Sequence, residues 1–73
     1  MNYFEFFEIE PSFFLDEEKL KSKFYQNSKQ YHPDFYTMES PAKQAEIMQL
    51  AVTNNKAYKI LGDFESRMKY ILE

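Results

Sequence analysis

One tripeptide, His32-Pro33-Asp34, carries the most distinctive chemistry in the chain. It places an imidazole and a carboxylate on either side of a proline, and His32 is the one histidine among 73 residues. A hydrolase would need a nucleophile with a positioned base, or a set of metal ligands. One histidine with one flanking aspartate is poor evidence for either. We therefore expect no enzyme activity, no metal site and no bound cofactor; ordinary turn chemistry and a binding role are the two interpretations of the triplet.

The residues before the triplet form a predicted helix that delivers it. The stretch from Asp16 to Tyr31 has no glycine or proline, and Leu20, Phe24 and Tyr31 fall on one face at helical spacing. Proline lacks an N–H and pushes the preceding residue out of the α region. Pro33 should therefore end the helix one or two residues before it. This places the triplet on a short turn, where side chains are presented rather than buried.

The same predicted helix is basic, although the protein as a whole is acidic. From Lys19 to Tyr31 there is no acidic residue. At about 100° per residue, Lys21, Tyr25 and Lys29 form one row, here called the basic stripe, and His32 projects toward the same side. The opposite flank of the core stripe holds Lys19, Lys23, Gln26 and Gln30. Lysines on a helix are ordinarily a solvated face, but a row that shares its side with the triplet favours an interaction surface.

Local signals predict the remaining elements. The expected N-caps are Asn2, Asp16, Ser40 and Asp63. The first helix should end at Pro11-Ser12, the third should begin at Pro41 and run to Leu61, and Gly62 should be its C-cap. Residues 35–39 are predicted to be loop. One glycine and three prolines leave little for hairpins, so the expected fold is all-α, an antiparallel pair of long helices with short first and last helices.

Apolar spacing predicts which side chains form the core. The inward stripe of the third helix is Ile47, Leu50, Ala51, Asn54, Tyr58 and Leu61, in which Asn54 is the polar exception. Ala51 and Ala57 should let the long helices approach closely. Phe13, Phe14 and Leu15 are expected to fold back onto the core, Met48 to fill a gap in it, and Phe64, Met68 and Ile71 to share one side of the last helix.

The overall composition limits the possible function classes. With 73 residues and no cysteine, the chain should be one small domain without disulfides, and an aromatic share of 19% supplies large rings for its modest core. A net charge of −3 argues against a nucleic-acid partner. There is no run of about 18 apolar residues and no basic-then-apolar start, so neither a transmembrane helix nor a signal peptide is predicted, and no membrane partner is expected.

Tyr31-His32-Pro33-Asp34 between two long helices resembles the J-domain of DnaJ-type co-chaperones. Finer features are similar to one branch, the HscB-type (Jac-type) co-chaperones of iron–sulfur cluster biogenesis. They are Asn2-Tyr3-Phe4-Glu5-Phe6-Phe7 at the start, Leu15-Asp16 before the second helix, Asn55-Lys56-Ala57-Tyr58-Lys59-Ile60-Leu61 in the third, and Arg67, Tyr70, Ile71 and Leu72 in the last. The chain departs from the pattern at Phe35, where many members carry Lys or Arg, and at Phe64, where the branch often has proline.

The resemblance implies that residues 1–73 are a J-domain that binds a DnaK- or HscA-type (70-kDa heat-shock) chaperone and stimulates its ATP hydrolysis in iron–sulfur cluster biogenesis. Asp34 would offer its carboxylate to a basic residue of the chaperone, Pro33 would hold the turn, and His32 would add hydrogen bonds and packing. The basic stripe would complete the partner-binding surface, with Lys21 and Lys29 steering the domain toward an acidic patch. ATP and magnesium would belong to the partner.

Two other functions stay open: a J-domain of another branch with different clients, and a J-like helical interaction module that stimulates no chaperone. The apolar end Tyr70-Ile71-Leu72 predicts that the chain is an N-terminal fragment. The C-terminal helical domain by which the branch grips the iron–sulfur scaffold protein would then lie outside it. A start at Met1 directly before the first helix favours a bacterial cytoplasm, and a mitochondrial matrix is the alternative if a transit segment has been removed.

Overall fold

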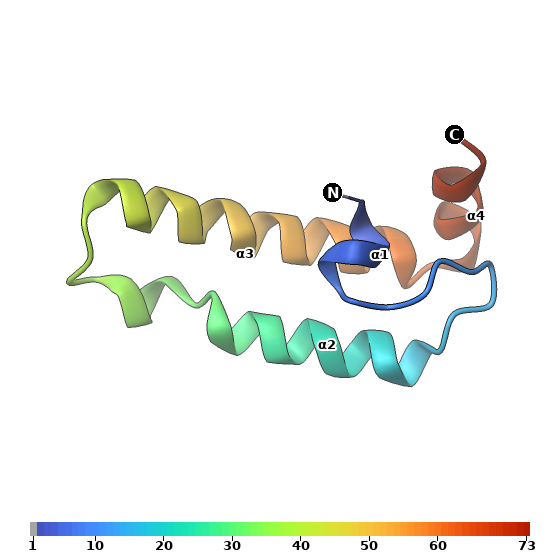
Figure 1. The fold of residues 1–73 in the computed structure, drawn as a ribbon, viewed down its shortest axis with the longest axis horizontal. Coiled ribbons are helices and arrows are strands. Elements are labelled where there is room, and N and C mark those ends of the chain that lie inside the picture. Colours follow the sequence, from blue (N-terminus) through green and yellow to red (C-terminus); the bar gives the residue numbers. More distant parts are fainter. Residues whose placement is uncertain (1) are drawn as a thin grey trace.

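Two long antiparallel helices dominate the computed structural model, which describes residues 2–73 (Figure 1). They are α2 (Glu17–Gln30) and α3 (Pro41–Leu61), and they run along the longest dimension of a molecule that measures 40 × 24 × 16 Å. Met1, on which the predicted native start depends, lies outside the described residues.

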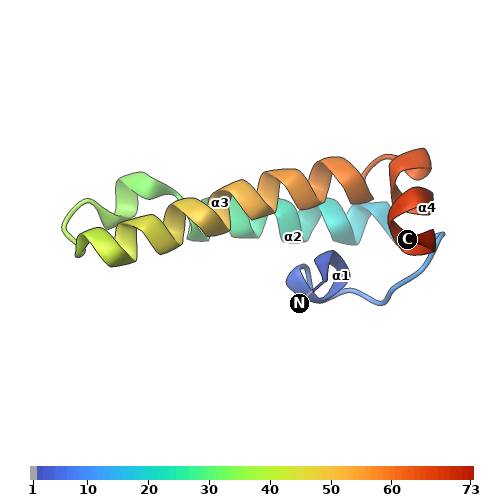
Figure 2. The same cartoon turned by 90° about the horizontal axis from the view of Figure 1, so that it is seen from above.

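The shorter elements occupy the two ends of this pair. Helix α1 (Tyr3–Phe6) lies beside α3, and α4 (Phe64–Leu72) crosses the end of the pair at a steep angle (Figures 1 and 2). The 3-10 helix η1 (Pro33–Tyr36) forms part of the turn at the opposite end. The predicted all-α fold, with long middle helices and short outer ones, is confirmed.

The helix boundaries follow the predicted caps closely. Each of Asn2, Asp16, Ser40 and Asp63 accepts, through a side-chain oxygen, a backbone N–H from the first turn of the helix that it precedes. These bonds satisfy donors that have no partner within the helix. Helix α3 begins with Pro41 and ends with Gly62 as its C-cap, as the sequence predicts.

The first helix is shorter than predicted, because it ends well before Pro11. Glu8 adopts a φ of 57°, in the left-handed region that residues with a side chain usually avoid. The N–H of Glu8 donates to the Glu5 carbonyl and the N–H of Ile9 donates to the Phe4 carbonyl, both at 3.0 Å. These bonds form a Schellman motif, in which the buried side chains of Phe4 and Ile9 take part. The chain therefore leaves the helix and turns into the core before it reaches the proline.

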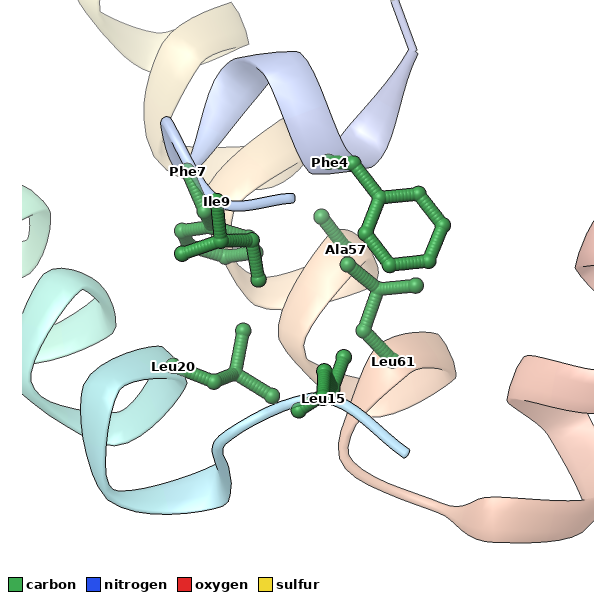
Figure 3. Packing of buried hydrophobic residues seen from close by; sticks show 7 residues of the cluster. All are labelled: Phe4, Phe7, Ile9, Leu15, Leu20, Ala57 and Leu61. Carbon is green, nitrogen blue, oxygen red and sulfur yellow. The ribbon is translucent and has the colours of Figure 1, made fainter. Parts of the chain in front are cut away.

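The main core lies at the end of the long pair that is remote from η1. Side chains from α1, from the segment after it, from the first turn of α2 and from the last turns of α3 meet there (Figure 3). Its buried members are Phe4, Phe7, Ile9, Leu15, Leu20, Ala57 and Leu61. A fully buried large apolar side chain contributes about 1.5–3 kcal/mol, so this cluster is the main source of stability.

Apolar side chains before α2 and at the start of α4 are less buried than predicted. Leu15 is buried, but Phe14 is 82% exposed and Phe13 is 36% exposed. Phe13 and Phe14 lie in a turn, in which the N–H of Phe14 donates to the Ser12 hydroxyl at 3.0 Å. On α4, Met68 and Ile71 are half-buried, whereas Phe64 is exposed and its ring lies 6.1 Å from that of Phe14.

Helix α3 confirms most of its predicted inward stripe and corrects one residue beside it. Ile47 and Leu61 are buried, and Asn54 is only 2% exposed. Met48, predicted to fill a gap in the core, is instead 53% exposed. Because Ile47 faces inward and each residue turns by about 100°, Met48 is carried away from the core.

Asn54 lies at the interface of the two long helices. Its Nδ2 donates to the Ser28 hydroxyl at 3.1 Å and to the Phe24 carbonyl at 3.3 Å, and Ser28 donates to the same carbonyl at 2.9 Å. Within residues 2–73 the Asn54 Oδ1 atom is buried and accepts no hydrogen bond. The rings of Phe24 and Tyr58 stack across the same interface, with centroids 4.1 Å apart.

Polar contacts from α4 attach that helix to the rest of the domain. Arg67 is only 3% exposed; its Nη1 donates to the Leu61 carbonyl at 2.7 Å and its Nε donates to the Phe13 carbonyl at 3.1 Å. The Tyr70 hydroxyl accepts the N–H of Tyr3 at 2.9 Å, and the two tyrosine rings stack 4.9 Å apart. Apolar spacing predicted apolar contacts on the inner side of α4. The structure places a buried arginine there as well.

Candidate functional site: the His-Pro-Asp turn

The triplet lies at the exposed end of the molecule, where the backbone leaves α2 and enters η1. Tyr31 is the C-cap of α2, and His32 has extended dihedral angles, φ −77° and ψ 120°, as a residue before proline should. Pro33 is then the first residue of η1, a position that needs no N–H. The helix therefore ends where the proline predicts, and the turn between the long helices begins at the triplet.

The two polar side chains of the triplet interact with each other. The N–H of Asp34 donates to Nδ1 of His32 at 3.3 Å, so the imidazole caps the first turn of η1. This bond needs a lone pair on Nδ1, which places the proton of the neutral ring on Nε2. One carboxylate oxygen of Asp34 lies 3.7 Å from the same Nδ1. The ring therefore orders the backbone at Asp34.

The Asp34 carboxylate itself faces solvent, because its side chain is 84% exposed. It is therefore accessible from solvent. Within residues 2–73, no cluster of three or more His, Cys, Asp or Glu side chains could hold a metal ion. The geometry therefore presents one exposed carboxylate on an ordered turn.

Two residues that the sequence did not single out hold this turn in place. The Tyr36 hydroxyl donates to the Gln30 carbonyl at 2.6 Å, which ties η1 back to the last turn of α2. From α3, Gln44 Nε2 donates to the carbonyls of Glu39 at 2.9 Å and Thr37 at 3.2 Å. Residues 35–39 were predicted to be loop, yet the first two belong to η1. Sequence spacing carries no signal for these bonds, because they cross an irregular turn.

All three residues of the basic stripe lie on the continuous helix α2, four residues apart. Tyr25 and Lys29 line one shallow hollow on the outward face of α2, together with Ser22 and two glutamines, Gln26 and Gln30. The glutamines were predicted to lie on the opposite flank of the core stripe; at about 100° per residue the two flanks meet on the face of α2 that points away from the core. Tyr25 is 55% exposed, and Lys29 forms no ion pair within residues 2–73.

The other predicted site residues line separate hollows. Lys21 borders one with Glu17 and Glu18, so acidic side chains share its surroundings. His32 and Pro33 border another, between α2 and α3. Tyr25 and Lys29 thus line one hollow, His32 and Pro33 border a second, and Lys21 borders a third, while Lys21, Tyr25 and Lys29 follow one row along α2 at spacings of four residues.

An exposed His-Pro-Asp turn between two long antiparallel helices is the arrangement expected of a J-domain. The family model of the DnaJ domain matches residues 2–70. The chain therefore belongs to the DnaJ-domain family.

Similar proteins narrow this class to the HscB type. Over 72 residues the chain is 35% identical to the co-chaperone protein HscB of Buchnera aphidicola subsp. Acyrthosiphon pisum (strain Tuc7) and 39% identical to an HscB homolog of Vibrio parahaemolyticus. Each match covers 99% of this chain, and 41% and 42% of the respective relative. The solved structure of the chaperone HscB from Vibrio cholerae has a TM-score of 0.95 at 38% identity, over 99% of this chain and 44% of that one.

These matches confirm the HscB-type J-domain that the motifs indicated. The chain spans about two fifths of the length of the curated relatives that it matches. Among residues 2–73, no helix combines the length and the apolar character that crossing a bilayer requires.

Proposed function

We propose that this domain binds a DnaK- or HscA-type (70-kDa heat-shock) chaperone through the His-Pro-Asp turn and stimulates its ATP hydrolysis. The observation that carries the proposal is the Asp34 carboxylate, which is 84% exposed on a turn that His32, Tyr36 and Gln44 hold by hydrogen bonds. A turn that is ordered before binding avoids part of the entropy cost of association. Asp34 would accept a hydrogen bond from a basic residue of the chaperone. Such a bond between two charged groups is stronger than one between neutral groups.

The lysines of α2 would act mainly by attracting the chaperone before the two proteins touch. Lys29 has no competing ion pair among residues 2–73 and shares its hollow with Tyr25, so it is the better placed to approach an acidic patch on the chaperone. Lys21, beside Glu17 and Glu18, should contribute less. Exposed charges chiefly accelerate association, and salt screens them over about 10 Å at 0.1 M.

The biological setting is inferred from the relatives. Proteins named HscB are the similar ones, so we propose a role in iron–sulfur cluster biogenesis, with HscA-type chaperones as the preferred partners. The relatives described above come from bacteria, which favours a bacterial cytoplasm as the site of action. The domain itself would not be an enzyme; ATP and magnesium would be bound by the chaperone. A J-domain of another branch, with different clients, would stimulate a chaperone other than the HscA type most strongly.

The test is single-turnover ATP hydrolysis by an HscA-type and by a DnaK-type chaperone, each measured with increasing concentrations of the domain. Asp34→Asn should abolish stimulation, because it removes the charge and keeps the shape. Glu39→Gln is the matched control, since it neutralises another exposed carboxylate of the same turn. Greater stimulation of the HscA-type enzyme would support the iron–sulfur branch, and greater stimulation of the DnaK-type enzyme would contradict it.

A second comparison separates steering from contact. Lys21→Ala combined with Lys29→Ala should weaken stimulation at low salt and have little effect at high salt. Lys56→Ala combined with Lys69→Ala removes the same charge from α3 and α4 and serves as the control. An equal loss for the α2 pair at all salt concentrations would refute electrostatic steering.

A further inference from the structure

Two apolar side chains stand out beside the triplet because almost nothing covers them. Phe35 is 73% exposed and Met38 is 98% exposed, whereas Tyr36 between them is half-buried. The Phe35 ring lies 5.6 Å from the imidazole of His32. The pair, here called the apolar tip, therefore adjoins the surface that carries the proposed activity.

The exposure of the apolar tip is fixed by an ordered backbone. The N–H of Phe35 donates to the His32 carbonyl at 3.0 Å, and the N–H of Glu39 donates to the Tyr36 carbonyl at 3.0 Å. Residues three apart in a 3-10-like turn lie on the same side, which brings Phe35 and Met38 to one face. Since Tyr36 and Gln44 hold the turn, the apolar tip is kept away from the core.

We propose that the apolar tip packs against an apolar patch of the chaperone, next to the basic group that receives Asp34. This inference rests on the proposed function and names a further part of the same interface. Burial of apolar surface is not screened by salt, unlike the attraction of Lys29 to an acidic patch. This part of the interface should therefore keep its strength at high ionic strength.

The chaperone fits this surface better than a second copy of the chain. A phenylalanine side chain buries about 150–250 Å², whereas a stable protein pair needs about 1,200 Å² or more in total. The apolar tip alone is thus too small for a dimer interface. In the proposed complex, His32 and Asp34 already contact the chaperone. The apolar tip therefore needs only to enlarge that interface.

The test is the concentration of domain that gives half-maximal stimulation of the chaperone, measured at low and at high salt. Phe35→Ser and Met38→Ser should each raise this half-maximal concentration. The increase for Phe35→Ser should be about tenfold. For each variant the factor should be the same at low and at high salt. Phe14→Ser is the control, because it removes another exposed phenylalanine, whose ring lies beside Phe64 at the start of α4 and far from the triplet. Thermal unfolding should be nearly unchanged in all three variants.

The outcomes separate this inference from the proposed function. If Asp34→Asn abolishes stimulation but Phe35→Ser leaves the half-maximal concentration unchanged, the apolar tip plays no part and the proposed function stands. An effect of Phe35→Ser that disappears at high salt would also overturn the inference. Sedimentation that shows the wild-type domain as a dimer and Phe35→Ser as a monomer would assign the apolar tip to self-association instead. Failure of the wild-type domain to stimulate either chaperone would remove both proposals.

Discussion

Replacement of Arg67 should destabilise the domain more than any exposed charge change. The side chain is 3% exposed and donates to the carbonyls of Leu61 and Phe13 at 2.7 and 3.1 Å. It thereby joins α4 to the end of α3 and to the segment before α2. Its contact with Glu17, in contrast, is 3.9 Å long, and the carboxylate side chain is 70% exposed.

These distances lead to a clear ranking of variants. A hydrogen bond from a charged donor contributes about 1.5–3 kcal/mol, and a buried carbonyl left without a partner costs about 1–3 kcal/mol. Arg67→Ala should therefore lower the free energy of unfolding by about 3–5 kcal/mol, against a total of about 4–11 kcal/mol for a chain of this size. Arg67→Lys can reach one carbonyl but not both, so about 2 kcal/mol should be lost. Glu17→Gln should cost less than about 1 kcal/mol, because the pair is exposed.

Equilibrium urea unfolding followed by far-UV circular dichroism measures this ranking. The account fails if Arg67→Ala costs less than about 1 kcal/mol, or if Glu17→Gln costs as much as Arg67→Ala. The second result would mean that the ion pair, and not the two carbonyl contacts, holds α4. Helix α4, which carries Arg67, lies at the opposite end of the molecule from the turn after α2, which carries the triplet (Figure 1). The folded fraction of Arg67→Lys should therefore stimulate a chaperone as the wild type does.

Three further substitutions test local features. Asn54→Leu should change the free energy of unfolding by no more than about 1 kcal/mol, because the loss of two hydrogen bonds from Nδ2 is offset by the removal of a buried oxygen that accepts none within residues 2–73; a larger loss would contradict this. Glu8→Gly should stabilise by about 0.5–1 kcal/mol, since φ is 57° and the 3.9 Å contact with Lys23 is exposed; a lower midpoint of unfolding would count against strain there. Hydrogen bonds from Ser66 lower the pKa of Asp63, so its stabilising effect is present at neutral pH and is lost as the pH falls below 3.8 and through the lowered value. Asp63→Asn should therefore lose less stability than the wild type between pH 7 and about pH 3 in urea titrations, and identical losses would contradict the role of the carboxylate.

Features that depend on a few adjacent residues could be predicted from the sequence. The N-caps at Asp16, Ser40 and Asp63 follow from one side chain and the next turn of the backbone. The end of α2 could be predicted because Pro33 acts on its immediate neighbours. The His-Pro-Asp turn could be predicted for the same reason. Its three residues are contiguous, and they are exposed because they directly follow the end of a helix.

Features that depend on distant partners could not be predicted in this way. Arg67 is buried because its acceptors include a carbonyl 54 residues earlier in the chain. Phe14 is exposed on a turn whose backbone is held by the Ser12 hydroxyl, and of its apolar segment only Leu15 is buried. At the site, Gln44 of α3 supports the preceding turn by donating hydrogen bonds to two of its carbonyls. No periodic pattern in the sequence marks such a residue. Long-range polar contacts, in short, carry no periodic signal in the sequence.

The structure separates the source of stability from the candidate site. The buried cluster around Phe7 and Leu61 lies at one end of the long helices, and the triplet lies at the other (Figures 1 and 3). Within η1 no residue is buried, so hydrogen bonds from Tyr36 and Gln44 supply its order. Substitutions of exposed side chains in the turn can therefore change recognition while the fold persists.

The most direct test of the central claim is the single-turnover rate of ATP hydrolysis by an HscA-type chaperone in the presence of the wild-type domain, Asp34→Asn or Glu39→Gln. The account predicts that the wild type and Glu39→Gln accelerate hydrolysis equally and that Asp34→Asn, shown to be folded, does not accelerate it. Normal acceleration by Asp34→Asn would contradict the account, because the exposed carboxylate of the turn would then have no role in stimulation.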